Sequence, residues 1–264
     1  MKNSKIIALL TDFGLTDHYV ACVKGSILSI NPEANIQDVC HAIKPQAIRE
    51  GAFLLREAYR VFPEGTIFVA VVDPGVGSSR KAICVQTSKG YLVGPDNGIL
   101  SLALSEEPTY EIRLIQNDQF FRKPVSSTFH GRDIFGPVAA WLSQKDIFKE
   151  VGEKIETIKD LEISKPKLTG NFLIGEIVYI DQFGNSITNI KKESAKKLGK
   201  EISPSAQIEV ASKHLSRLCV FFSEGQAKEL ISVWNSSGFL ELAVPNGSAE
   251  TEFKLKVGDE VKVL

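Results

Sequence analysis

Cysteine is scarce in this chain and is not arranged as a structural site. Cys22, Cys40, Cys84 and Cys219 are scattered along the sequence, with no CxxC pair and no cysteine–histidine spacing typical of a metal centre. We therefore expect reduced thiols, most of them buried, and no protein-bound metal.

Long apolar runs and an excess of one charge sign are absent as well. The apolar stretch after the N-terminal lysines ends at Thr11, which is too short for the core of a signal peptide, and no stretch reaches the length of a membrane-spanning helix. The formal net charge is −1 over 264 residues, with lysines and glutamates interspersed. A nucleic acid or a membrane is therefore not expected as the main partner. These absences favour a cytoplasmic globular protein that binds small molecules.

Common nucleotide fingerprints are missing too. Gly75 and Gly77 match the first two glycines of GxGxxG, but Arg80 occupies the third position, where close packing of helix on strand requires glycine. Asp38 lies near a second strand, as a ribose-binding acid would in an NAD-dependent oxidoreductase, but no fingerprint precedes it. Neither GxxxxGK[ST] nor HExxH occurs. These absences argue against phosphate-cradling and zinc chemistry.

The first half of the chain contains a regular alternation of short apolar strands and helices. This alternation predicts an α/β domain with a parallel sheet and crossover helices. The clearest helix is residues 45–61, whose apolar residues recur every three or four positions and should face the core. The other expected elements are strands at Lys5–Leu10, Asn35–Val39, Ile67–Val72, Ala82–Thr87, Tyr91–Val93 and Tyr110–Ile115, and helices at Tyr19–Ser29 and Ile134–Leu142.

The second half has a different pattern. Residues 157–171 are polar and contain lysine, proline and glycine, which suits an exposed connection. Beyond it, short strand-like runs separated by turn residues predict a small antiparallel sheet or barrel. These runs are Gly175–Ile180, Ser186–Ile190, Ala206–Val210, Leu218–Phe222, Gly238–Val244 and Glu260–Leu264. We assign residues 1–160 to an α/β domain and residues 171–264 to a smaller, mainly β domain, with a ligand cleft expected between them.

The most informative motif is DPGVGSSR, from Asp73 to Arg80, directly after the apolar run 67–72. A continuous apolar run is typical of a central strand covered on both faces, and open α/β sheets bind ligands where such strands end. Pro74 and the two glycines allow a tight turn that presents backbone N–H groups. Taken alone, the motif is more often an ordinary turn followed by an exposed arginine.

Two further motifs of the first domain carry candidate residues. Asp12, in TDFG after the first strand, suits the vicinal hydroxyls of a ribose, or equally a helix N-cap. His130, in FHGRD before a helix, suits a base or an orienting group, although a lone histidine there is more often a surface or capping residue. Arg132 and Asp133 are expected to pair locally or to cap the helix.

The second domain adds two turns. Asp181, Phe183 and Asn185 lie in DQFGN, where a carboxylate, an aromatic face and an amide suit an ammonium group and a purine, or form a plain β-turn. The run Asn235–Gly238, followed by the strand that contains Glu241, is a turn or a hydrogen-bonding rim.

Taken together and in this order, the motifs resemble those of the S-adenosyl-L-methionine (SAM) hydrolases, also called SAM hydroxide adenosyltransferases, which are relatives of the SAM-dependent fluorinase and chlorinase. The match is carried by Thr11–Gly14, Asp73–Arg80, Gly94–Gly98, Phe129–Asp133, Asp181–Ile190 and Asn235–Ala243. The resemblance implies a Rossmann-like N-terminal domain, a C-terminal β-barrel domain, and a homotrimer with sites between one subunit's N-terminal domain and its neighbour's C-terminal domain. It implies hydrolysis of SAM to adenosine and L-methionine by in-line attack of water or hydroxide on the ribose C5′ carbon, without a cofactor.

The resemblance also implies a role for each candidate residue. Asp73, Arg80 and His130 would border the attacking water, with Asp73 and His130 both open as its base. The implied substrate contacts are Asp12 with the ribose hydroxyls, Asp181 with the methionine ammonium group, Phe183 and Asn185 with the adenosine, and Ser236, Glu241 and the backbone near Ala243 and Val244 with the rest of the nucleoside.

Two alternatives share the fold. The resemblance implies that a SAM-dependent halogenase would have an uncharged residue at the position of Asp73, a residue other than histidine at position 130, and an arginine in the turn that contains Ser237. A carboxylate such as Asp73 beside the halide site would repel the halide ion. A non-catalytic SAM or adenosine sensor would not need the three charged residues. The sequence therefore favours the hydrolase.

Overall fold

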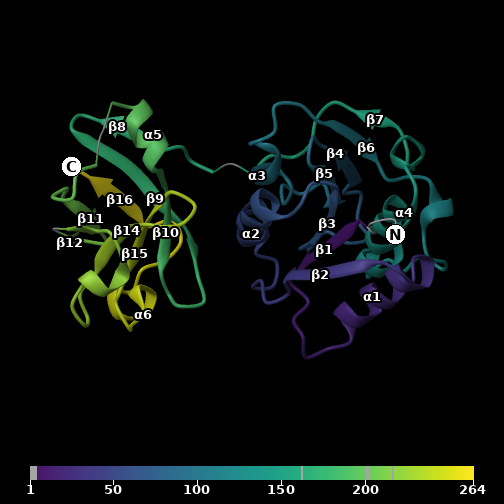
Figure 1. The fold of residues 1–264 in the computed structure, drawn as a ribbon, viewed down its shortest axis with the longest axis horizontal. Helices are drawn as coiled ribbons and strands as arrows, with labels where there is room; N and C mark the ends of the chain where they lie inside the picture. Colours follow the sequence, from purple (N-terminus) through teal and green to yellow (C-terminus); the bar gives the residue numbers. More distant parts are fainter. Residues whose placement is uncertain (1–4, 162, 200–201, 216) are drawn as a thin grey trace. The chain divides into compact units, whose positions relative to one another are not determined.

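The computed structural model describes residues 5–161, 163–199, 202–215 and 217–264. The chain divides into two compact units, Met1–Leu161 and Glu162–Leu264, each built around its own sheet (Figure 1).

The first unit contains a mostly parallel sheet with the strand order β2-β1-β3-β5-β4-β6-β7. Strand β1 pairs in parallel with β2 and β3, and β3 pairs in parallel with β5; β4, which joins β5 in a hairpin, is antiparallel to both its neighbours. The strands are β1 (Ile6–Thr11), β2 (Asn35–Cys40), β3 (Thr66–Val71), β4 (Ala82–Gln86), β5 (Gly90–Pro95), β6 (Glu111–Leu114) and β7 (Lys154–Ile155).

Helices cover both faces of this sheet. In Figure 1, α2 and α3 lie on one side, and α1 and α4 on the other. The helices are α1 (Tyr19–Ile30), α2 (Ile48–Val61), α3 (Ser101–Leu104) and α4 (Gly136–Gln144), with short 3₁₀ turns at Asp118–Phe120 and Phe148–Glu150 and a π-helical turn at Gly131–Phe135. The alternate residues of β3 enter two separate cores, Phe68 and Ala70 on the α2 side and Ile67, Val69 and Val71 on the other. The prediction of a central strand covered on both faces is confirmed.

Helix α2 buries the predicted apolar stripe, because its residues at three- and four-residue spacing pack against the sheet. It begins at Ile48, three residues later than predicted. Gln46 has a left-handed backbone (φ 67°), and Ala47 is not helical either. Pro45 and Gln46 line the cavity described below, so local geometry at the site overrides the helical pattern.

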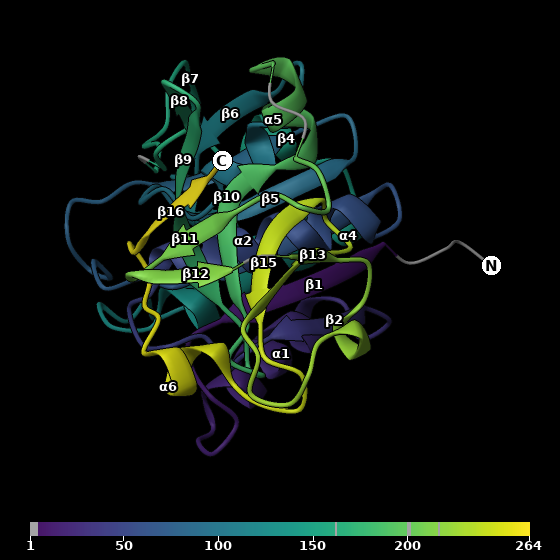
Figure 2. The same cartoon turned by 90° about the vertical axis from the view of Figure 1, so that its left-hand side faces the viewer.

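The second unit is a curled, half-barrel sheet with the order β12-β11-β16-β9-β10-β15-β14-β13, and β8 pairs with β9 (Figure 2). All its pairs are antiparallel except β13 with β14. The strands are β8 (Lys167–Thr169), β9 (Phe172–Ile180), β10 (Ser186–Lys191), β11 (Ile208–Val210), β12 (Lys213–Leu215), β13 (Leu218–Cys219), β14 (Ile231–Trp234), β15 (Phe239–Ala243) and β16 (Glu260–Val263), and the helices are α5 (Lys192–Lys197) and α6 (Ala249–Phe253), with a 3₁₀ turn at Phe222–Glu224.

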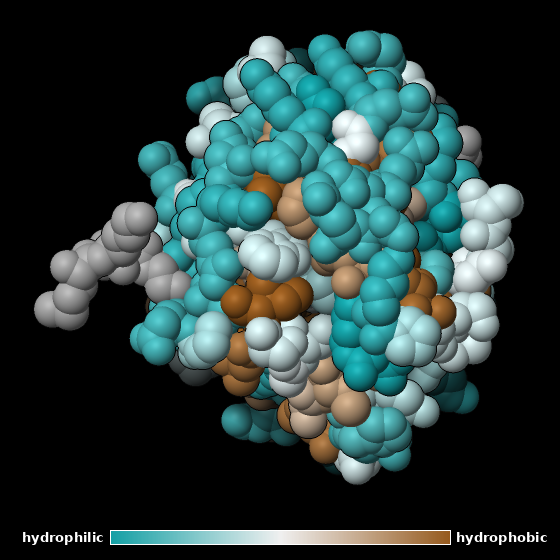
Figure 3. Space-filling model, turned by 90° about the vertical axis from the view of Figure 1, so that its right-hand side faces the viewer, coloured by the Kyte–Doolittle hydropathy of each residue, from teal (hydrophilic) through white to brown (hydrophobic). Residues whose placement is uncertain are grey.

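The surface of the first unit is consistent with the mixed composition, whereas the prediction that most cysteines are buried holds for only two of the four. One face of the first unit is mainly hydrophilic, with a small group of hydrophobic side chains near its centre (Figure 3). All four cysteines are free; Cys84 and Cys219 are buried, and Cys22 and Cys40 are half-buried. Within the described ranges, no helix combines the length and the apolarity needed to cross a bilayer.

Candidate active site

The carboxyl ends of β1 and β3 place two aspartates side by side. These strands pair in parallel with Thr11 opposite Val71, so Asp12 and Asp73 leave the sheet at the same edge. A cavity of about 570 Å³ opens there, entirely within the first unit, and both carboxylates line it. His130 lines it from the segment that enters the π-helical turn. Three residues far apart in the sequence therefore line one cavity, two of them from strand ends and His130 from the entrance to a helix.

Arg80 lies between Asp73 and His130 and bonds to both. Its Nε donates to Asp73 Oδ1 and Oδ2, both at 2.9 Å, and its Nη2 donates to Asp73 Oδ2 at 2.5 Å. The same Nη2 lies 2.7 Å from His130 Nδ1. The Arg80 guanidinium also packs over the Phe135 ring, 5.2 Å from its centroid. Only 7% of the Arg80 side chain and 4% of the Asp73 side chain are exposed, so solvent screens this ion pair weakly.

These contacts fix the protonation of His130. A guanidinium only donates hydrogen bonds, so Nδ1 of His130 must accept and the proton of the neutral ring must be on Nε2. Burial and then the Arg80 charge lower the pKa of His130, and the charges of Asp73 and Asp133 oppose them only in part. His130 is therefore a neutral ring with an N–H donor at Nε2.

The turn that contains Asp73 and Arg80 depends on Gly77. This residue has φ 75°, and a Cβ on it would lie 2.2 Å from the backbone oxygen of Ser127. Glycine thus lets the turn lie directly against the segment that leads to His130.

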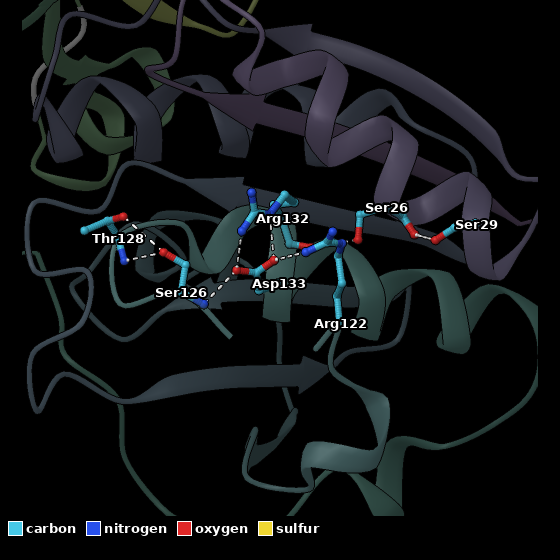
Figure 4. Close-up of polar contacts among 7 residues, drawn as sticks. All are labelled: Ser26, Ser29, Arg122, Ser126, Thr128, Arg132 and Asp133. Carbon is cyan, nitrogen blue, oxygen red and sulfur yellow. Dashed lines mark hydrogen bonds and ion pairs between the residues drawn. The ribbon is translucent and has the colours of Figure 1, made fainter. Parts of the chain in front are cut away.

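The segment before His130 is fixed by a fully buried carboxylate (Figure 4). Asp133 accepts two hydrogen bonds from Arg132, at 2.7 and 2.8 Å, and one from the backbone N–H of Ser126 at 2.9 Å. Arg122 Nη1 lies 3.4 Å from Asp133 Oδ1. The expected local pairing of Arg132 with Asp133 is confirmed, and it closes the loop that forms one wall of the cavity.

Aromatic side chains form another part of the wall. Phe13, Tyr19 and Phe129 line the cavity and contact one another with ring centroids 5.4 to 6.1 Å apart. Phe13 and Phe129 stand inside motifs noted above. Tyr19 carried no sequence signal, because it opens α1 like any other apolar residue of that helix.

The GPDNG turn supports the site without lining the cavity. Asn97 Nδ2 donates to the backbone oxygen of Val72 at 2.8 Å, one residue before Asp73. Asp96 accepts from the backbone N–H of Lys159 at 2.7 Å. Both contacts of the Gly94–Gly98 turn are architectural.

The candidate residues of the second unit form a separate group around the β9–β10 turn. Asp181 Oδ1 accepts from the backbone N–H groups of Phe183 and Asn185, both at 2.9 Å, and the Phe183 ring is 66% exposed. Glu241 is brought beside this turn because it pairs with Ile187 across β10 and β15. Burial raises the pKa of Glu241, and the charge of Asp181 adds to that effect.

The remaining three candidates of this unit lie on or after β14 and β15. Ser236 is exposed in the turn between them, next to Asn235, whose Oδ1 accepts from the backbone N–H groups of Ser237 and Phe239, both at 3.0 Å. The side chains of Ala243 and Val244 are buried, so only their backbone is available to a ligand.

Family models match both units of the chain. The SAM hydroxide adenosyltransferase N-terminal domain matches residues 7–152, and the C-terminal domain of the same family matches residues 175–262. This chain belongs to the SAM hydroxide adenosyltransferase family.

The similarity between this chain and its relatives extends over nearly the whole length of the chain. It is 35% identical to the (R)-S-adenosyl-L-methionine hydrolase of Methanocaldococcus jannaschii, with 98% of this chain and 95% of that protein covered. It is 34% identical to the (R)-S-adenosyl-L-methionine hydrolase of Thermus thermophilus (98% and 99% covered) and 28% identical to a fluorinase of Nocardia brasiliensis (98% and 96% covered). A crystal structure of an uncharacterised Thermotoga maritima protein superimposes with a TM-score of 0.90 at 39% identity, covering 97% and 99% of the two chains.

This member of the SAM hydroxide adenosyltransferase family also contains a buried histidine, His41, that the motifs did not indicate. It follows β2 and bonds to Thr11, directly before Asp12. Among the residues that the structure describes, no group of three His, Cys, Asp or Glu side chains is placed to hold a metal ion.

Proposed function

We propose that this protein hydrolyses SAM to adenosine and L-methionine. The observation that carries the proposal is the hydrogen-bonded Asp73–Arg80–His130 trio at a cavity that the Asp12 carboxylate also lines. The cavity thus offers groups for a water molecule and, from the neighbouring strand, an acceptor for ribose hydroxyls. The curated hydrolases at 31–35% identity support the same reaction.

The chemistry demands little acid catalysis. A water oxygen forms a bond to C5′ while the C5′–S bond breaks, and the electron pair of that bond leaves with sulfur as a neutral thioether. One water proton stays on the new 5′-hydroxyl and the other must go to an acceptor. The protein therefore has to position the water, stabilise developing hydroxide and hold the substrate in line.

We assign the acceptor role to Asp73. Its Oδ2 accepts from both Nε and Nη2 of Arg80, whereas Oδ1 accepts from Nε alone and keeps a second lone pair for the water. His130 Nδ1 is occupied by Arg80, so the ring offers the water an N–H donor at Nε2 instead of a base. Arg80 holds both partners and supplies the positive charge that stabilises developing hydroxide.

The remaining roles follow the family resemblance. Asp12 would bind the ribose hydroxyls, Asp181 the methionine ammonium group and Phe183 and Asn185 the adenosine, with Ser236, Glu241, Ala243 and Val244 around the nucleoside. We further propose a homotrimer whose sites combine two subunits, and a reaction that needs no cofactor. A cytoplasmic location stays a prediction of the sequence.

The decisive experiment is incubation of the purified protein with SAM in ¹⁸O-labelled water, with and without added chloride, followed by mass spectrometry. We expect adenosine labelled at the 5′ oxygen, methionine and no chlorinated nucleoside. A chlorinated nucleoside would instead identify a halogenase. Intact SAM that stays bound would identify a sensor, and either result would overturn the proposed hydrolysis.

A further inference from the structure

A buried histidine without a role in the trio lies behind the Asp12 loop. His41 follows β2, and only 2% of its side chain is exposed. Its Nδ1 lies 2.8 Å from Thr11 Oγ1, at the carboxyl end of the neighbouring strand β1. At this depth the surroundings of both ring nitrogens matter, because a buried polar atom is costly without a partner.

The second nitrogen of His41 faces a charged pair. His41 Nε2 lies 3.0 Å from Asp38 Oδ1, and Lys24 Nζ, from α1, donates to Asp38 Oδ2 at 2.7 Å. The contact of Nε2 with Asp38 has ion-pair distance without the geometry of a hydrogen bond. A proton on Nε2, beside the carboxylate, leaves a lone pair at Nδ1 that accepts from the Thr11 hydroxyl. The result is one path of contacts, Thr11 to His41 to Asp38, with Lys24 bound to Asp38 at its far end.

The near end of this path holds the backbone on both sides of Asp12. Thr11 Oγ1 accepts from the backbone N–H of Phe13 at 3.2 Å, and Gly14 N–H donates to the backbone oxygen of His41 at 2.8 Å. Asp12 lies between these anchors. Its own Oδ2 accepts from the backbone N–H of Gln46 at 2.9 Å, which leaves Oδ1 and the second lone pair of Oδ2 for a ligand.

We propose that Thr11 and His41 are positioning residues that hold the Asp12 carboxylate in the orientation needed to bind the vicinal hydroxyls of a ribose. Two hydroxyls on adjacent carbons must meet the carboxylate in one plane, so a small rotation of the loop would lose one of the two hydrogen bonds. The inference rests on the proposed function, because it takes Asp12 as the ribose ligand.

The test compares two buried threonines of adjacent strands. Thr11→Val removes the hydroxyl at the site, whereas Thr66→Val removes an equally buried hydroxyl at the start of β3, where Thr66 Oγ1 donates to Pro63 O. His41→Asn is the third variant, since its amide is too short to join Thr11 to Asp38. Binding of adenosine and of 2′-deoxyadenosine to the full-length protein is measured by calorimetry, together with kcat and KM for SAM and the midpoint of urea unfolding.

We expect Thr11→Val and His41→Asn each to weaken adenosine binding by about tenfold, the value of one hydrogen bond to a charged group. KM for SAM should rise similarly, with kcat within about twofold of the wild type. Binding of 2′-deoxyadenosine should change much less, because it lacks the second hydroxyl. The double variant should lose no more than the larger single loss, since both residues act on one path. Thr66→Val should lower only the unfolding midpoint.

Three other results would overturn the inference. If the wild type binds adenosine but Thr11→Val and His41→Asn bind it equally well, the path is structural and the proposed function is untouched. If both nucleosides lose the same affinity, the path does not act through the ribose. If the wild type binds neither adenosine nor SAM, the proposed function fails and the inference with it.

Discussion

At the scale of single residues, His130 is held in one protonation state by its neighbours. Burial and the Arg80 charge lower its pKa from the ordinary value near 6.5. Because a histidine with a lowered pKa binds its proton only at more acidic pH, the neutral ring that accepts from Arg80 persists below pH 6.5. We expect the NMR titration of the His130 ring to have its midpoint below 6.5, and the loss of kcat/KM due to protonation of His130 between pH 7.5 and 6.5 to be smaller than for a histidine with the ordinary pKa. A midpoint at or above 6.5 would contradict this arrangement.

The same shift affects stability. The unfolded chain takes up a proton on His130 near pH 6.5, while the folded chain does so only at lower pH, so the free energy of unfolding falls as the pH drops through 6.5. The pH slope should weaken in His130→Gln, whose amide does not titrate. Gln also keeps an N–H donor near the position of Nε2, so this variant should retain more activity than His130→Ala.

Asp73 is the residue on which water activation depends. In Asp73→Asn the carboxylate is lost with little change in shape, so kcat should fall by at least about 100-fold, the usual scale for a group that takes a proton from the nucleophile. The dissociation constant of SAM should change little, because Asp73 is expected to touch the water and not the substrate. Single-turnover kinetics and calorimetry measure the two quantities.

Asp118→Asn provides the matched control for that substitution. Asp118 pairs with Lys123 on the surface, and 70% of its side chain is exposed. Its loss should leave both constants unchanged. An equal loss of SAM affinity in Asp73→Asn would move Asp73 from the water to the substrate.

At the scale of elements, the turn after β3 packs directly against the segment before the π-helical turn, and Gly77 makes this close contact possible. In Gly77→Ala the new Cβ would meet the Ser127 oxygen and the backbone would keep a left-handed φ. We expect the free energy of unfolding to fall by about 1–3 kcal/mol and kcat/KM to fall with it. Gly25→Ala, in α1 with open space around its Cβ, should instead be neutral or stabilise the helix by up to about 1 kcal/mol. Urea unfolding of the two variants, with activity assays, would show this contrast; equal effects would remove the special role of the turn.

The elements that the sequence predicted well are those with a strong repeating pattern. Strand β3 is buried at every position and apolar from Ile67 onward, and α2 repeats its apolar residues at helical spacing, so both were found despite shifted ends. The short elements of the second unit were harder. Strand β14 has only four residues, and α6 has five, too few to establish a period. Strand β13 ends at Cys219 because the chain then enters a 3₁₀ turn at Phe222–Glu224.

The site residues that follow directly after strands could be predicted from the sequence. Those whose role depends on a contact with a distant part of the chain could not. Asp12 and Asp73 follow strands, so the parallel pairing of β1 with β3 was enough to place them together. His41 is also at a strand end, but its meaning comes from Thr11, thirty positions earlier, and from the charge pair behind it. The spacing of residue types along the sequence does not reveal contacts between residues that are so far apart.

At the scale of the whole molecule, the candidate residues divide between two units. The trio and Asp12 belong to the first, whereas the Asp181–Asn185 turn and Glu241 belong to the second. If each site combines the first unit of one subunit with the second unit of its neighbour, a chain with an inactivating substitution in the first unit and a chain with one in the second unit can together form an intact site. If each site lies within a single chain, two such chains cannot form an intact site.

The test uses two inactive variants, Asp73→Asn in the first unit and the double variant Phe183→Ala/Asn185→Ala in the second. The two chains carry different affinity tags and are produced together, and only assemblies that carry both tags are purified. A mixed cyclic trimer contains either two chains of one variant and one of the other, or the reverse. In both cases one of its three sites combines an unmutated first unit with an unmutated second unit. These mixed trimers should therefore recover about one third of the wild-type activity, whereas each variant alone stays inactive. Light scattering checks that the assembly contains three chains. Mixed trimers without activity would place every site within a single chain, because each chain then carries its own lesion into its own site.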